Sequence, residues 1–176
     1  MEMVLKRIKG EVSMNYIYVG KIVNTHGIKG ELRIKSDFDK KDIIFKPGFT
    51  LYIGEGYVAE KIVTYRVHKE FDMVTFEGYN NINQVLNYLK LNVYVKREDL
   101  SLNNDDYLLQ DLIGLNVVEN GEMLGKVSEI VYNGINVLLS ISGENNFYIP
   151  KNGDFIKKVD LEKGIIEVKD AKGLIL

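Results

Sequence analysis

The stretch YVGKIVNTHGIKGELRIK, residues 18–35, decides the fold of the first half of the chain. Apolar residues at Ile17, Val19 and Ile22 precede a short segment that carries two glycines, Gly27 and Gly30. Glycine adopts a positive φ angle at little steric cost, so this spacing predicts a sharp turn between two strands. At least one of the two glycines is expected to have a positive φ.

Charged and apolar residues alternate after this turn, which predicts a strand with two different faces. Leu32 and Ile34 lie on one face, and the other carries mostly basic side chains, at Lys29, Glu31, Arg33 and Lys35. Such a face is commonly just solvated. A phosphate-binding loop is disfavoured, because Gly20-Lys21 is not followed by Ser or Thr and no helix pattern follows Gly30.

Composition points to a cytoplasmic protein with a packed core, in one domain or two small ones. Apolar residues make up 45% of the 176 residues, and no apolar run approaches the ~20 residues of a membrane span. The absence of cysteine excludes disulfides, zinc–thiolate sites and cysteine nucleophiles. Residues 1–99 carry 16 Lys and Arg against 13 Asp and Glu, whereas residues 100–176 carry 7 against 12. The mildly basic and the acidic half therefore predict different partners.

Frequent short apolar runs between Gly, Pro, Asn and Asp turns predict a mainly β protein of two small barrels. One helix is expected where Ile82, Val85, Leu86 and Leu89 form an apolar stripe, capped by Asn81. The pairs Asn120-Gly121 and Asn133-Gly134 predict hairpin turns in the second half. We expect a weakly ordered leader at 1–13, a first barrel at 14–99, a linker at 100–106 and a second barrel at 107–176.

Searches for catalytic or metal-binding patterns give little support for an enzyme. His68 has no second histidine at metal-ligand spacing, and a solvated side chain is the ordinary expectation. Asp105 and Asp106 are adjacent, so their side chains diverge and cannot flank one reacting bond. No Gly-x-Ser-x-Gly motif occurs in the sequence. No metal or cofactor is expected.

Several motifs, in their order along the chain, resemble the ribosome maturation factor RimM family. The first is Gly20-Lys-Ile-Val-Asn-Thr-His26-Gly-Ile-Lys-Gly30-Glu-Leu-Arg-Ile34, and the second is Asp111-Leu-Ile-Gly114 with the following Leu115–Val118. Gly121-Glu122, Leu124–Val127, Ile149-Pro150, Val159–Glu162 and Gly173-Leu174 complete the pattern. The resemblance spans about residues 15–175.

The resemblance implies a translation-factor-like N-terminal barrel and a C-terminal PRC barrel. It further implies a monomeric, non-catalytic assembly factor for late maturation of the small (30S) subunit head and for 16S rRNA processing. Such a factor binds the free small subunit through ribosomal protein uS19. We expect the protein contact at Tyr107, Leu108, Asp111, Leu112 and Gly114, and the 16S rRNA or subunit contact at Lys21, His26, Lys29, Arg33 and Lys35.

Two positions depart from the family pattern. Leu108 stands where the family often has a second aromatic residue, and Lys90 stands near the helix end where glycine is common. Simple core packing is an equally open interpretation of Leu112 and Ile113. A generic RNA-binding module of two barrels is the alternative function, with a small-molecule enzyme third.

Overall fold

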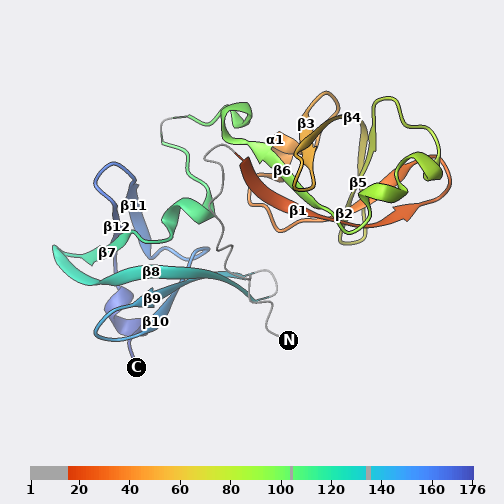
Figure 1. The fold of residues 1–176 in the computed structure, drawn as a ribbon. Coiled ribbons are helices and arrows are strands. Elements are labelled where there is room, and N and C mark those ends of the chain that lie inside the picture. The colour runs from red at the N-terminus through yellow and green to blue at the C-terminus, as the bar shows by residue number, and fades with distance from the viewer. Residues whose placement is uncertain (1–15, 104, 134–135) are drawn as a thin grey trace. The chain divides into compact units, whose positions relative to one another are not determined.

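The computed structural model describes residues 16–103, 105–133 and 136–176, which divide into two compact units on either side of residue 104. Each unit is built on six strands. Figure 1 shows them as labelled arrows, and the predicted mainly β class is confirmed. The predicted leader at 1–13 and the turn at Gly134 lie outside the described residues.

The first unit is a closed barrel with the strand order β1-β2-β5-β4-β3-β6. Its strands are β1 (Tyr16–His26), β2 (Glu31–Lys35), β3 (Thr50–Ile53), β4 (Val58–His68), β5 (Phe71–Phe76) and β6 (Asn92–Lys96). Buried and partly exposed residues alternate along β2 and β6 as the sequence predicts. The barrel core includes Ile17, Val19, Ile22, Leu32, Ile34, Leu51, Ile53, Ile62, Val74, Phe76, Val93 and Val95.

The turn between β1 and β2 depends on two left-handed glycines. Gly27 has a φ of 65° and Gly30 a φ of 87°, which confirms the prediction for this hairpin. Gly30 is also buried, and a Cβ atom there would lie 3.3 Å from the backbone oxygen of Asn81. The hairpin is therefore fitted closely against the segment that follows β5.

The prediction of an α-helix over residues 82–89 is wrong. The structure has two 3₁₀ turns, η1 (Ile82–Gln84) and η2 (Leu86–Tyr88), interrupted at Val85. A 3₁₀ turn repeats every three residues, so Val85 and Tyr88 are the buried pair while Leu86 is 45% exposed. The predicted cap is confirmed, because the Asn81 side chain accepts a hydrogen bond from the backbone N–H of Asn83. The only α-helix of the described residues is the short α1 (Lys41–Ile44).

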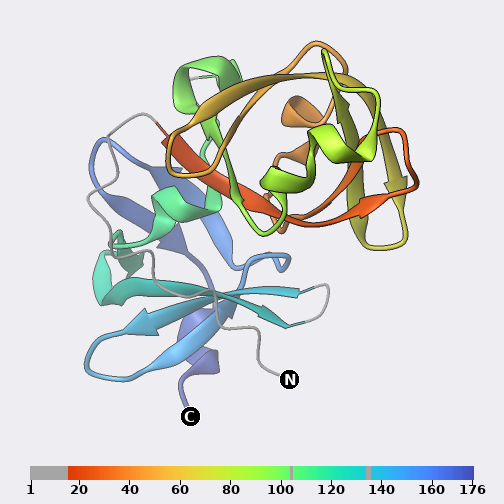
Figure 2. The same cartoon turned by 45° about the vertical axis from the view of Figure 1, so that its right-hand side comes forward.

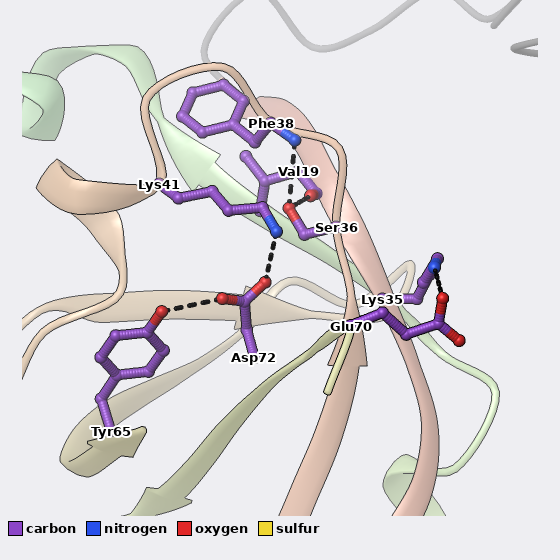
Figure 3. Close-up of polar contacts among 8 residues, drawn as sticks. All are labelled: Val19, Lys35, Ser36, Phe38, Lys41, Tyr65, Glu70 and Asp72. Carbon is purple, nitrogen blue, oxygen red and sulfur yellow. Dashed lines mark hydrogen bonds and ion pairs between the residues drawn. The ribbon is translucent and has the colours of Figure 1, made fainter. Parts of the chain in front are cut away.

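Two buried carboxylates lie near opposite ends of β4 and β5. Asp72, which is 2% exposed, accepts hydrogen bonds from Lys41 Nζ at 2.7 Å and from Tyr65 Oη at 2.8 Å (Figure 3). Burial and this bond to Asp72 raise the pKa of Tyr65 to about 12. At the other end, Glu60 Oε1 accepts from the hydroxyls of Tyr79 and Tyr88. Both acids are thereby satisfied, as buried charge requires.

The second unit is a six-stranded sheet with the order β10-β9-β8-β7-β12-β11. Its strands are β7 (Asn116–Glu119), β8 (Glu122–Asn133), β9 (Asn136–Ser142), β10 (Phe147–Pro150), β11 (Ile156–Asp160) and β12 (Ile165–Val168). Asn120 and Gly121 have φ angles of 51° and 81°, which confirms the predicted β7–β8 hairpin. Three 3₁₀ turns complete the described fold (Figure 2): η3 (Arg97–Leu100), η4 (Leu109–Leu112) and η5 (Ala171–Leu174).

Candidate functional site

The basic residues predicted to contact RNA lie on the β1–β2 hairpin of the first unit. Lys21 is paired in register with Lys35 across the two strands, and both side chains face outward. Lys29 is exposed in the turn. We call Lys21, His26, Lys29, Arg33 and Lys35 the hairpin face.

Arg33 is held in place by two aromatic rings. Its Nη2 lies 2.7 Å from Nδ1 of His26, and its Cζ lies 5.8 Å from the ring centroid of Phe71. The Nζ of Lys35 lies at the same distance from that ring. Phe71 thus supports two cations of the hairpin face. Sequence reasoning missed it because it begins β5, which pairs with β2 but is the third strand after it along the chain.

Carboxylates neutralise part of this surface. The Nζ of Lys35 donates to Glu70 at 2.9 Å (Figure 3), and Arg66 makes a two-bonded pair with Glu31 at 2.6 and 2.9 Å. The hydrogen bond from Arg66 lowers the pKa of Glu31 and correspondingly raises the pKa of Arg66. Within the described residues, no carboxylate forms an ion pair with Lys21 or Lys29. These two lysines are therefore the most available for phosphate oxygens.

His68 adjoins the hairpin face from β4. Its ring centroid lies 5.5 Å from that of His26. Desolvation, with Arg66, His26, Lys69 and Arg33 nearby, lowers its pKa. The side chain is partly buried, so the expectation of a simply solvated histidine does not describe it fully. The described residues include no group of acidic and histidine side chains able to hold a metal.

In the second unit, the predicted partner residues gather around η4. Tyr107 is partly buried, and the Nζ of Lys151 lies 5.6 Å from its ring centroid. Asp111 is a positioning residue, because its Oδ2 accepts the backbone N–H of Leu108 at the start of the turn. Gly114 has a φ of 88° and donates its N–H to the carbonyl of Val127 at 2.7 Å.

Leu108 and Leu112, two of the residues expected at the protein contact, are buried in the structure. Both are 0% exposed, so neither side chain offers a surface to a partner in this conformation. Leu112 belongs to the core cluster of the second unit, whereas its neighbour Ile113 is 48% exposed. Of the apolar side chains considered around η4, Tyr107 and Ile113 are the ones that remain accessible.

Lys90 explains a departure from the family pattern. It follows η2 with a φ of 67°, a left-handed conformation that glycine adopts without strain. Its backbone N–H donates to the carbonyl of Ile22 at 2.8 Å. The position thus favours glycine for the backbone, and the lysine is accommodated there at some cost.

Comparison with known proteins places both units in one family. Residues 17–100 match the RimM N-terminal domain, and residues 109–174 match the RimM PRC barrel domain. The chain belongs to the RimM family. This membership confirms the resemblance drawn from the motifs and makes the chain a non-catalytic ribosome maturation factor.

Curated relatives agree over nearly the whole chain. Ribosome maturation factor RimM of Staphylococcus haemolyticus is 39% identical over 164 residues, covering 90% of this chain and 98% of its own length. The RimM of Staphylococcus aureus strain RF122 is 37% identical with the same coverage. A crystal structure described as a 16S ribosomal RNA processing protein RimM from Pseudomonas aeruginosa is 22% identical with a TM-score of 0.45, covering 89% of this chain and 99% of that one.

No helix in the described part of the chain is long and apolar enough to cross a membrane.

Proposed function

We propose that this RimM-family chain acts in the cytoplasm in late maturation of the head of the small ribosomal subunit and supports 16S rRNA processing. In this proposal it acts as a monomer, binds the free small subunit and contacts ribosomal protein uS19. The observation that carries the proposal is the match to ribosome maturation factors over 90% of this chain, across both units. It acts by holding partners together, and no bond-making step is assigned to it.

The second unit is proposed to hold uS19. Residues 100–176 carry 7 basic and 12 acidic side chains, which suits a basic ribosomal protein. Tyr107 and Ile113 supply accessible apolar surface beside η4, and such residues carry much of the affinity in protein interfaces. The other predicted contact residues are proposed to support this surface rather than to touch the partner. Leu108 and Leu112 do so as buried side chains, and Asp111 and Gly114 through hydrogen bonds that fix the backbone around η4.

The hairpin face of the first unit is proposed to contact 16S rRNA. Lys21 and Lys29 can approach phosphates directly, whereas Arg33 and Lys35 are already engaged with rings or a carboxylate. His26 positions Arg33 through the contact between Nη2 and Nδ1. Because only a few cations are free, this contact should add to the protein contact rather than replace it.

Co-sedimentation of the full chain with purified small subunits, whole ribosomes and isolated uS19 tests the proposal. We expect binding to free small subunits and to uS19, and little binding to whole ribosomes. Replacing Tyr107 with Ala should weaken uS19 binding through faster dissociation. Replacing Tyr148, which is 52% exposed on β10, with Ala is the matched control and should change nothing. Normal uS19 binding by the Tyr107→Ala chain would assign the interface elsewhere.

Salt dependence separates the proposal from a generic RNA-binding module. A binder driven by phosphates alone loses affinity steeply as salt rises and accepts unrelated RNAs. We expect the uS19 contact to persist at salt that removes the contribution of Lys21 and Lys29. A Lys21→Ala/Lys29→Ala chain should bind the whole subunit less tightly and isolated uS19 unchanged.

A further inference from the structure

Five tyrosines gather on the outer surface of the first barrel, beside the hairpin face. They come from β1, β3, β6 and the turn between β3 and β4, and we call them the tyrosine cluster: Tyr16, Tyr18, Tyr52, Tyr57 and Tyr94. Each retains partial exposure. Sequence reasoning missed the group, although the four tyrosines on strands, Tyr16, Tyr18, Tyr52 and Tyr94, alternate with buried apolar residues.

The strand register brings the rings into one continuous surface. Tyr94 is paired with Tyr18 on one side and with Tyr52 on the other, so one row of rings crosses three adjacent strands. Tyr57 stacks on Tyr16 with ring centroids 3.9 Å apart and meets Tyr94 edge-on at 5.0 Å. The rings therefore brace one another, which fixes their orientation before any ligand arrives.

Cations border the cluster on two sides. The Nζ of Lys96 lies 5.0 Å from the ring centroid of Tyr52 and 5.8 Å from that of Tyr16. Glu98 lies 3.9 Å from this ammonium and offsets part of its charge. On the other side, Lys21 is paired with Asn92 of β6 and with Lys35 of β2. The tyrosine cluster and the hairpin face are therefore neighbours along β1.

We propose that the tyrosine cluster is a stacking platform for the unpaired bases of single-stranded RNA, whose phosphates run along Lys21 and the rest of the hairpin face. Barrel proteins that bind single strands combine aromatic rings for the bases with a basic track for the backbone. The inference deepens the proposed function and rests on it, because it supplies the kind of RNA that the first unit contacts. A proline-rich protein segment also fits aromatic surfaces, but it would gain nothing from the adjoining lysines.

Binding of short labelled oligonucleotides to the full chain tests this inference. The probes are fluorescein-labelled oligouridylate and oligoadenylate of about 12 nucleotides, within the ~4–16 nucleotides that one such barrel binds. An abasic ribose-phosphate chain of the same length provides the charge without the bases. The chain contains 11 tyrosines and no tryptophan, so tyrosine emission can be followed without tryptophan emission, and its quenching on binding is a second readout.

The variants remove rings while keeping apolar side chains on the strands. Tyr52→Leu/Tyr94→Leu should bind both base-containing oligonucleotides about tenfold more weakly, because stacking supplies much of such affinity. The same chain should bind the abasic probe as the wild type does. Tyr52→Phe/Tyr94→Phe keeps the rings and should stay within about twofold of the wild type. Tyr148→Leu, in the second unit, is the matched control and should leave all affinities unchanged.

Three results would overturn the inference. One is oligonucleotide binding that the leucine variant retains in full, and another is equal binding of the abasic and base-containing probes by the wild type. The third is binding of a proline-rich decapeptide that the leucine variant abolishes, which would assign the cluster to a protein segment. Co-sedimentation of the wild-type chain with small subunits separates the two proposals: a wild type that binds the subunit but neither oligonucleotide leaves the proposed function standing and removes this inference alone.

Discussion

The carboxylate of Asp111 accepts a hydrogen bond from the backbone N–H of Leu108 at 2.9 Å, three residues back along the chain. This bond satisfies a donor at the start of η4, where no preceding turn can do so. It thereby fixes the backbone between Tyr107, which is partly exposed, and Leu112, which is in the core. The hydrogen bond between Asp111 and Leu108 therefore helps to hold the proposed uS19 surface in place.

Replacing Asp111 with Ala should therefore loosen η4. Loss of a capping acceptor typically costs about 1 kcal/mol of unfolding free energy. We expect a lower thermal midpoint and weaker uS19 binding, measured by calorimetry. Asp111→Asn keeps an acceptor oxygen and should retain most of the thermal stability and most of the affinity for uS19. Equal losses in the two variants would show that the carboxylate charge, rather than the cap, matters.

Alanine should reduce the stability of the second unit strongly at Leu112 and hardly at all at Ile113. Leu112→Ala creates a cavity in the core of the second unit and should cost about 2–5 kcal/mol in chemical denaturation. Ile113 is 48% exposed, so Ile113→Ala should change stability by less than about 0.5 kcal/mol. If Ile113 lies in the uS19 contact, only its binding constant will change. A large stability loss at Ile113 would contradict this assignment of the two side chains.

Gly30 should tolerate alanine less well than Gly27. Both have left-handed backbones, which costs a substituted residue roughly 1–2 kcal/mol. At Gly30 the new Cβ would also lie 3.3 Å from the Asn81 carbonyl oxygen, whereas nothing lies within 4 Å at Gly27. Thermal unfolding of the two alanine variants compares these positions. Identical midpoints would mean that the contact with Asn81 relaxes freely.

Replacing Lys90 with Gly should stabilise the first unit. The left-handed φ of 67° disfavours a residue with a Cβ, and glycine removes that strain, on the order of 1 kcal/mol. We expect the thermal midpoint to rise by a few degrees. Lys90→Ala keeps the strain while removing the charge, so it should not reproduce the gain. A stabilised alanine variant would point to charge instead.

His68 should make stability depend on pH near neutrality. Its pKa is lowered in the folded state, so the unfolded chain binds a proton more readily. The stability that the neutral His68 side chain contributes is present above the ordinary histidine pKa of about 6.5. It is lost as the pH falls through the lowered pKa of His68 in the folded state. Denaturant midpoints measured from pH 8 to pH 5 should fall less steeply for His68→Gln. An unchanged slope would show that His68 is not the group responsible.

The sequence predicts most of the strands because their alternation is strong. Leu32 and Ile34 face the core as their spacing requires, and Asn120-Gly121 forms the expected hairpin. The segment at residues 82–89 defeats the same reasoning, because apolar residues at spacings of three and four fit an α-helix and 3₁₀ turns alike. Which spacing is used depends on contacts with Glu60 and Ile22, which are distant in sequence.

The functional surfaces were less accessible to sequence reasoning. The charges of the hairpin face could be placed on one side of a strand, but the partner Glu70 comes from the turn between β4 and β5, and Phe71 from the start of β5. Leu108 and Leu112 are apolar like Ile113, and only the local backbone decides which of them is exposed. The tyrosine cluster exists only through the pairing of β1 with β6 and of β6 with β3.

The parallel pairing of β12 with β7 has a consequence for how the protein is made. The first barrel closes when β6, ending at Lys96, reaches β1, so it can fold while the rest of the chain is still being translated. β7 in contrast pairs in parallel with β12, whose last residue is Val168. The second unit must therefore wait for almost the whole chain to emerge from the ribosome before its sheet is complete. A factor arrested late in its synthesis would carry a finished first barrel and an unfinished second sheet, with an open strand edge at β7.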